Sequence, residues 1–469
     1  MTRAPVTGLF RALVLAALLA APVLSGPAAA EESAGGYALL EGHGGPVKGL
    51  AVSPDGRFAA TASFDTALGL WSLPEGRHLR WLDGHEAAAN AVLFLPEGRM
   101  VSAGDDFALI LWEAETGTVE RRFKGHKGKI ISLAAAADGK IASAGWDGLI
   151  GLWDLNAEQS GPMRWLEGHQ ANVNDVVFSR DGQTLYSASY DGTIRRWDLS
   201  EEAPRPETLR SHGFGVNHLL LDEEAGWLAY GALDGAVRAL DLATGETIAD
   251  LTTERRPILA MVRAPGGQFL ATGDGEGYVT VIDTETWTIE RDFRAALMGP
   301  IWALAWAMAP DGSPGRVLAG GLADEAALWP VLDDAAEAAP FAGGTRAFHR
   351  DPVEMTNGER QFMRKCSICH TLTGDGGRKA GPSLANLFGR RAGTLPGYRY
   401  SEALTGSDII WNAETIGALF RQGPDVFTPG SKMPIQRIAK AADRADLIDY
   451  LRDETNGAAR ESAPDTTRE

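Results

Sequence analysis

The fold of the first two thirds of the chain is decided by a stretch that recurs, and Gly168–Asp198, GHQANVNDVVFSRDGQTLYSASYDGTIRRWD, is its clearest copy. It opens with Gly168-His169, closes with Trp197-Asp198, and has Asp191 six residues before the tryptophan. In an earlier copy, the alternating residues of Phe58–Ser63 are typical of a short, half-buried β-strand. The stretch therefore predicts a repeated unit of short strands.

The unit returns at a nearly constant period. Its histidines are 42, 41, 43 and 43 residues apart, at His43, His85, His126, His169 and His212. A tryptophan follows each of the first four after 27 or 28 residues, at Trp71, Trp112, Trp153 and Trp197. An aspartate stands six residues before each of these, at Asp65, Asp106, Asp147 and Asp191. Later units are degenerate, at Leu240-Asp241, Ile282-Asp283 and Trp329.

This pattern resembles the WD-repeat family, in which one period forms a four-stranded propeller blade. The resemblance implies that the repeated histidine, aspartate and tryptophan serve a hydrogen-bond network inside each blade. Sets of three strands from Val47 to Trp329 number seven, and so do the outer strands, which begin with Tyr37–Leu40. We therefore expect an all-β, seven-bladed propeller over residues 37–331, with the first strand completing the last blade and closing the ring.

Composition limits the classes of function. The chain has 469 residues, of which 44% are apolar and 23% charged, so it is long enough for more than one folded domain. Acidic residues outnumber basic ones by 62 to 44, giving a net charge of −18. Nucleic acid is therefore not an expected partner, because phosphate binding needs a basic surface.

The first thirty residues have the layout of a targeting segment. Arg3 and Arg11 give a basic start, Ala12–Leu24 is apolar, and Ala28–Ala30 supplies small residues. We interpret residues 1–30 as a signal peptide for the general secretion route, which places the mature protein in the periplasm with no membrane span. An uncleaved membrane anchor is the alternative.

Both cysteines of the chain stand in Cys366-Ser367-Ile368-Cys369-His370. This is the pattern for covalent attachment of haem c, in which the two thiols bond to the haem vinyl groups and the histidine binds the iron. A zinc site and a redox dithiol are the alternatives. A zinc site needs further Cys or His ligands, and His349 is the only one nearby in the sequence.

The flanking residues come in the order and spacing of small soluble class I cytochromes c, as in mitochondria and alphaproteobacteria. The matching segments are Gly381-Pro382, Leu387–Arg390, Gly397–Ser401, Trp411 and Pro429–Met433. The resemblance implies an all-α domain, for which we take residues 351–455, with one haem c and Met433 as the second iron ligand. No histidine follows His370 in the sequence.

The same resemblance assigns roles around the haem. The carbonyl of Pro382 would orient His370, and Arg390, Tyr400 and Trp411 would surround a haem propionate. Lys365, Lys379 and Lys432 would frame the exposed haem edge. Leu419 stands where mitochondrial members have a tyrosine, and Leu404 stands where many members have an asparagine. Both differences would make the methionine side of the haem less polar.

Charge is divided unevenly along the chain. Residues 351–455 contain 14 basic and 13 acidic side chains, so a net charge of about −20 falls on residues 31–350. Between the domains, residues 332–350 are rich in Ala, Asp, Pro and Gly and are interpreted as a linker. Residues 456–469 are predicted to be a disordered tail.

These features predict a periplasmic mono-haem c-type cytochrome that transfers single electrons. The WD-repeat propeller would be a docking or scaffold module for a redox protein, either donor or acceptor. An alternative is an oxidoreductase whose propeller holds a second cofactor or substrate and passes electrons to the haem. A redox-responsive scaffold is a third hypothesis.

Overall fold

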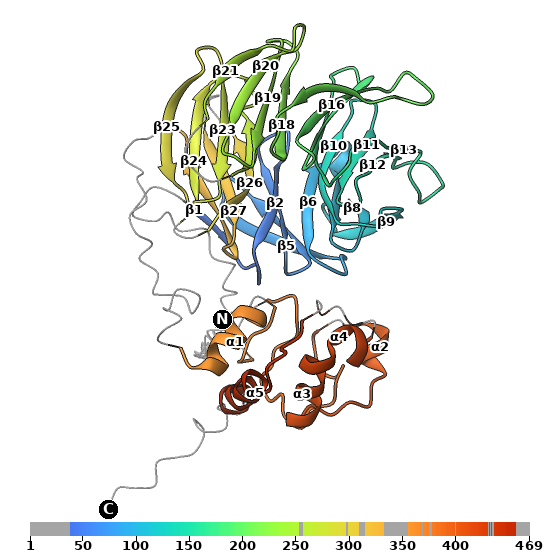
Figure 1. The fold of residues 1–469 in the computed structure, drawn as a ribbon, viewed down its shortest axis with the longest axis vertical. Coiled ribbons are helices and arrows are strands. Elements are labelled where there is room, and N and C mark those ends of the chain that lie inside the picture. Colours follow the sequence, from blue (N-terminus) through green and yellow to red (C-terminus); the bar gives the residue numbers. More distant parts are fainter. Residues whose placement is uncertain are drawn as a thin grey trace, which may run out of the picture.

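The computed structural model describes residues 38–252, 257–296, 299–308, 315–332, 355–367, 369–374, 378–398, 400–429, 431, 433 and 436–455. The predicted signal peptide and tail, and the predicted linker beyond Leu332, lie outside the described residues, as does Lys432. Figure 1 shows a propeller of strands with a helical domain at one end of it. Within the described ranges, the helices are all too short or too polar to cross a bilayer.

The propeller consists of seven four-stranded antiparallel sheets, which we number as blades along the chain. Blades 1 to 3 comprise β2 (Val47–Val52), β3 (Phe58–Ser63), β4 (Ala67–Ser72), β5 (Arg77–Asp83); β6 (Ala89–Phe94), β7 (Arg99–Gly104), β8 (Ala108–Glu113), β9 (Thr118–Lys124); and β10 (Ile130–Ala135), β11 (Lys140–Gly145), β12 (Ile150–Asp154), β13 (Arg164–Leu166). Blades 4 and 5 comprise β14 (Val173–Phe178), β15 (Thr184–Ser189), β16 (Thr193–Asp198), β17 (Glu207–Ser211); and β18 (Val216–Asp222), β19 (Trp227–Ala232), β20 (Val237–Asp241), β21 (Thr247–Asp250). Blades 6 and 7 comprise β22 (Ile258–Arg263), β23 (Phe269–Asp274), β24 (Tyr278–Asp283), β25 (Thr288–Arg294); and β26 (Ile301–Ala307), β27 (Arg316–Gly321), β28 (Glu325–Pro330), β1 (Ala38–Glu41).

The ring is closed by strands from the two ends of the propeller sequence. Strand β1 pairs antiparallel with β28, with Ala38 opposite Leu328 and Glu41 opposite Glu325. The predicted completion of the seventh blade by the first strand is therefore confirmed. Because the closing pair comes from opposite ends of the propeller, its hydrogen bonds join the first and last units of the ring and leave few strand edges unpaired.

The core of the propeller lies between neighbouring blades. One buried cluster combines Ala60 and Leu68 of blade 1 with Val92 and Trp112 of blade 2, and similar clusters follow around the ring. The four repeated tryptophans are at most 2% exposed. Each blade alone would leave its apolar face in water, so stacking all seven is what stabilises the fold.

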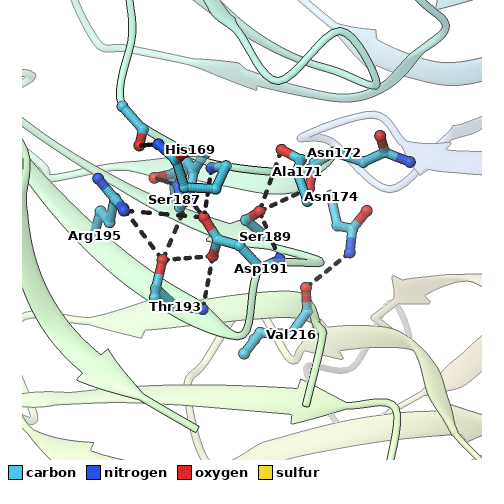
Figure 2. A network of polar contacts seen from close by, with 12 residues as sticks. His169, Ala171, Asn172, Asn174, Ser187, Ser189, Asp191, Thr193, Arg195 and Val216 are labelled. Carbon is cyan, nitrogen blue, oxygen red and sulfur yellow. Dashed lines mark hydrogen bonds and ion pairs between the residues drawn. The ribbon is translucent and has the colours of Figure 1, made fainter. Parts of the chain in front are cut away.

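Each of the first four blades is held together by one hydrogen-bond network, which Figure 2 shows for blade 4. His169 Nδ1 lies 2.9 Å from a carboxylate oxygen of Asp191, and its Nε2 lies 2.8 Å from the hydroxyl of Ser187. That hydroxyl also accepts a 2.8 Å hydrogen bond from Trp197 Nε1. Since the tryptophan can only donate and the carboxylate can only accept, Nδ1 carries the imidazole proton. The histidine and the aspartate therefore serve the blade.

Removing the hydroxyl at the centre of this network should have a large effect on stability, and blade 3 offers a test. Ser143 is completely buried and contacts His126 Nε2 at 2.7 Å and Trp153 Nε1 at 2.8 Å. We expect Ser143→Ala to lower the free energy of unfolding by about 2–4 kcal/mol, because two buried polar atoms lose their partner. Thermal and denaturant unfolding would measure the loss. The exposed Ser200→Ala is the control, and equal stability of the two variants would contradict the prediction.

The histidine face is the name we give to the end of the propeller that carries His43, His85, His126 and His169. These residues lie in the loops that enter the inner strands, and their aspartates lie in the turns after the second strands. In an antiparallel blade these two connections are at the same end. The blade network fixes the histidine and the aspartate of these loops but not their other side chains, which are free to differ from blade to blade.

The helical domain contains α1 (Asn357–Lys365), α2 (Glu402–Thr405), α3 (Ala413–Gln422), α4 (Pro424–Phe427) and α5 (Ala441–Thr455). Helix α1 begins at the N-cap Thr356, whose hydroxyl accepts the amide hydrogen of Glu359. Helix α3 begins at Asn412, whose side chain forms a capping box with Thr415. Local sequence thus determines where both helices start.

The first and last helices of this domain cross at Gly358. A Cβ atom at this position would lie 2.2 Å from the carbonyl oxygen of Asp446 and 2.7 Å from Cβ of Tyr450, so only glycine allows the approach. Phe362 packs on Tyr450 with ring centroids 5.8 Å apart, and Leu447 and Leu451 are buried beside them. This crossing brings the end of α1, and the cysteine motif that follows it, onto the core of the domain.

Candidate haem site

The cysteine motif begins where α1 ends. The amide of Cys366 donates to the carbonyl of Phe362 at 2.8 Å, which is the last hydrogen bond of the helix. The amides of Cys369 and His370 both donate to the carbonyl of Cys366, at 3.0 and 2.8 Å. This extra turn brings Cys366, Cys369 and His370 to the wall of one cavity.

A backbone carbonyl determines how the imidazole of His370 is oriented. Nδ1 of His370 lies 2.7 Å from the carbonyl oxygen of Pro382, to which it can only donate. The other nitrogen, Nε2, is then the unprotonated one that can bind a metal. Burial lowers the pKa of His370, which favours this neutral form. A Cβ atom at Gly381 would lie 2.4 Å from Cε1 of the ring, so the preceding glycine is needed for the approach.

The cavity has a volume of about 460 Å³. It brings together all eight residues that the sequence analysis assigned to a haem, namely Cys366, Cys369, His370, Pro382, Arg390, Tyr400, Trp411 and Met433. The rest of its wall is largely apolar, with side chains such as Leu387, Ile416 and Phe420. A mostly apolar cavity with two thiols, one imidazole and one thioether fits a haem c.

Two polar residues of the cavity wall, Arg390 and Tyr400, are positioned by neighbouring carbonyls and by an aromatic ring. The guanidinium of Arg390 donates to the carbonyls of Ala385 and Ser383, each at 2.8 Å, and burial lowers its pKa. Tyr400 packs edge-on against Tyr398, with ring centroids 4.8 Å apart. A charged guanidinium and a phenol in a partly buried wall could bind the carboxylate of a propionate.

One methionine also lines the cavity. Met433 is part of the wall, as are Leu419 and Leu404, the two leucines that depart from the family pattern. Met363 packs instead against the core of the helical domain, Met355 is buried, and neither is part of the cavity lining. Among the described residues that line the cavity, Met433 is therefore the one methionine that could offer a thioether sulfur.

The environment of the thiols bears on the alternative of a redox dithiol. Burial raises the pKa of the Cys366 thiol to about 12 and also raises the pKa of Cys369. A redox-active thiol needs the opposite, because the thiolate is the reactive form.

For the zinc alternative, the described residues contain no group of three or more His, Cys, Asp or Glu side chains placed to hold a metal ion. His349 lies outside the described residues.

Comparison with known proteins agrees with both domains. The family "WD domain, G-beta repeat" matches residues 37–72, 76–113, 117–154 and 160–198, and the family "Cytochrome c" matches residues 355–454. Cytochrome c of Sesamum indicum is 41% identical over 104 residues, which are 22% of this chain and 93% of that protein. Cytochrome c of Gibberella zeae is 40% identical over 102 residues, 22% of this chain and 95% of that protein. The chain belongs to the cytochrome c family.

Its two domains have different general functions. The cytochrome c domain indicates haem c and electron transfer, and the WD propeller indicates protein interaction. Fusion of the two in one chain ties an electron carrier to an interaction module.

The propeller itself contributes to the wall of the haem cavity, which the sequence analysis did not anticipate. The lining includes residues of blades 1 to 3 on the histidine face, namely Phe64, Thr66, Glu86, Ala87, Ala88, Asp105 and Lys129. Of the three lysines expected at the haem edge, Lys365 lines the cavity and Lys432 lies outside the described residues. Lys379 is described but is not part of the lining. No signal within the cytochrome c domain reveals this contact, because it depends on loops far away in the sequence.

Proposed function

We propose that the protein is a periplasmic mono-haem c-type cytochrome that carries single electrons, and that its propeller holds a redox protein near the haem. The observation that carries this proposal is the single cavity lined by Cys366, Cys369, His370 and Met433. Haem c, when bound there, supplies an iron that alternates between the ferrous and ferric states.

The residues of the cavity would each have a defined part. Cys366 and Cys369 would bond covalently to the haem vinyl groups. His370, held by the Pro382 carbonyl, would present Nε2 to the iron, and Met433 would present its sulfur from the other side. An iron held by both His370 and Met433 would have no open position for a substrate, which would suit electron transfer rather than catalysis.

The propeller offers a surface for a protein partner beside this cavity. Trp146, Tyr190 and Phe214 lie on the histidine face of blades 3 to 5 and are 45%, 59% and 59% exposed. Aromatic side chains are enriched at the centres of protein interfaces. Lys129 connects the two regions, because it lines the cavity and its Nζ lies 5.6 Å from the ring centroid of Trp146. A redox protein bound to these aromatic residues would be close to the haem at high effective concentration.

Location in the periplasm is supported by the signal-like residues 1–30 and by the haem type. Attachment of haem c takes place on the outer side of the membrane, so the motif at Cys366–His370 and the proposed export are consistent with each other.

Absorption spectra of the purified full chain, oxidised and reduced, test the proposed function. We expect one haem per chain, a low-spin spectrum in both states and no change on addition of carbon monoxide, because His370 and Met433 would both bind the iron. Binding of carbon monoxide, or a second chromophore, would contradict the proposal and favour an oxidoreductase with a site in the propeller.

A further inference from the structure

The cytochrome c domain contacts the propeller mainly through Arg378. Its Nε lies 3.4 Å from a carboxylate oxygen of Asp65, and its Nη2 pairs with Asp83. Its guanidinium carbon lies 5.4 Å from the ring centroid of Trp81. All three partners belong to blade 1, so one cation of the cytochrome c domain meets two carboxylates and an aromatic ring of the acidic propeller.

Asp65 also belongs to the hydrogen-bond network of blade 1. Within blade 1 it accepts hydrogen bonds from His43 Nδ1 at 3.0 Å and from the amide of Gly44 at 2.9 Å. Burial raises the pKa of Asp65, but the hydrogen bonds outweigh it and hold the pKa below its usual value. The carboxylate that stabilises blade 1 is therefore ionised and able to attract Arg378.

A sequence difference between blades makes room for this contact. The residue after the repeated histidine is Gly44 in blade 1, but Glu86, Lys127 and Gln170 in blades 2 to 4. In all four blades its amide donates to the network aspartate at 2.8 or 2.9 Å, so the backbone role is the same. A Cβ atom at Gly44 would lie 1.1 Å from the carbonyl oxygen of Arg378.

The blade itself does not require this glycine. Gly44 does not have the positive φ that L-residues avoid, and the equivalent positions of three other blades carry long side chains. The obstacle to a side chain at Gly44 is the backbone of the cytochrome c domain. Among the four blades with the complete network, blade 1 is thus the one without a side chain at this position, as docking of that domain requires.

This contact covers the haem cavity. Phe64, Thr66, Glu86 and Asp105 of the histidine face are part of the cavity wall, so a haem edge would face the propeller instead of the solvent. A large redox protein could not reach that edge in this arrangement, whereas a small ion could approach through the rest of the opening.

We propose that the histidine face of blade 1 is a docking surface for the chain's own cytochrome c domain, which shields the haem edge until a redox protein displaces it. This regulation rests on the proposed electron-transfer function. The contact is suited to reversal, because Arg378 and Asp83 are 27% and 57% exposed and ion pairs of this kind are weak. A partner captured by the aromatic residues of blades 3 to 5 would then meet a released cytochrome c domain.

Gly44→Gln tests the proposal in the full-length haem protein. It gives blade 1 the residue that blade 4 carries as Gln170, and it should displace the backbone of Arg378. We expect a larger radius of gyration in small-angle scattering. We also expect oxidation of the ferrous haem by a small blue copper protein to become about tenfold faster, since a minor open state usually amounts to about 0.1–10% of the molecules. Oxidation by ferricyanide should change less than about threefold, because a small ion reaches the haem in both states.

Gln170→Gly, in the blade away from Arg378, is the matched control and should behave as the wild type in all three measurements. If thermal unfolding shows that Gly44→Gln does not fold, Arg378→Asp should open the contact, and the added Asp83→Arg should partly restore the wild-type rate. Equal scattering and equal copper-protein rates in wild type and Gly44→Gln would overturn the docking proposal. A haem that reacts with neither oxidant in any variant would instead refute the proposed function, and scattering would still decide the docking.

Discussion

A chain with both Cys366→Ser and Cys369→Ser is expected to release all of its haem when it is denatured in acidified acetone, whereas the wild type should retain all of it. In the folded protein, both cysteines line the haem cavity one turn apart, beyond the end of α1. Thioether bonds from these positions survive unfolding, whereas iron ligation by His370 and Met433 does not. Extraction followed by a haem assay of the polypeptide and the solvent measures the difference.

Ser367→Ala is the matched control for the cysteine variants. Ser367 stands between the two cysteines and is buried, but it contributes only a 2.7 Å hydrogen bond from its hydroxyl to the carbonyl of Met363. The Ser367→Ala variant should therefore retain its haem on the polypeptide. Either single cysteine variant should also retain the haem, through one thioether. Release of the haem from wild-type protein would show that the site holds it by ligation alone.

Sequence predicts the propeller well where the blade network is complete. Blades 1 to 4 carry histidine, aspartate and tryptophan at fixed spacing, and the WD family matches these units. In blade 5, Tyr230 stands where the other blades have a small hydroxyl residue, and Leu240 replaces the tryptophan. His212 there contacts Asp234 through Nε2 instead of Nδ1, at 3.0 Å. The hydrogen-bond network of blade 5 therefore contains a larger side chain. Because the motif is altered from this blade onward, the later blades are recognised from the number of strands and the closure of the ring.

The hydroxyl that joins histidine to tryptophan was not predicted from the sequence. Thr61, Ser102, Ser143 and Ser187 recur four residues before each aspartate, so a signal was present in the spacing. The position carries threonine in blade 1 and serine in blades 2 to 4, and Ser63 and Ser189 stand in two of the same strands, so the recurring hydroxyl is hidden among ordinary strand residues. Their role becomes clear only when the fold places each hydroxyl between two rings.

In the haem site, too, residues of one sequence motif are easier to predict than contacts between distant parts of the chain. The cysteine motif stands out in the sequence, and the resemblance to class I cytochromes c points to Met433, because a cofactor of fixed shape demands particular residues in a particular order. The contact of Arg378 with Asp65 and Asp83 involves residues about 300 positions apart, and it depends on how two separately folded domains meet. In the sequence, the one feature related to this contact is that Gly44 stands where blades 2 to 4 have side chains.

Met433→His is expected to lower the reduction potential of the haem by a few tenths of a volt, within the range of about 0.8 V that axial ligands span. A thioether is a soft, neutral ligand that favours ferrous iron, and an imidazole donates more strongly and favours ferric iron. Leu404 and Leu419 line the same cavity as Met433 and carry no polar group that could offset the exchange. Spectroelectrochemical titration of the full chain measures the shift, and the haem should stay low-spin because both axial positions remain filled.

Met363→Leu separates ligation from packing in this prediction. Met363 packs against the core of the cytochrome c domain from helix α1, and leucine preserves its volume and apolar character. Its potential should therefore stay within a few hundredths of a volt of the wild type, since nothing bound to the iron has changed. If Met433→His left the potential unchanged while Met363→Leu moved it, the sulfur ligand would be Met363. Met433 would then pack around the haem rather than supply its second ligand.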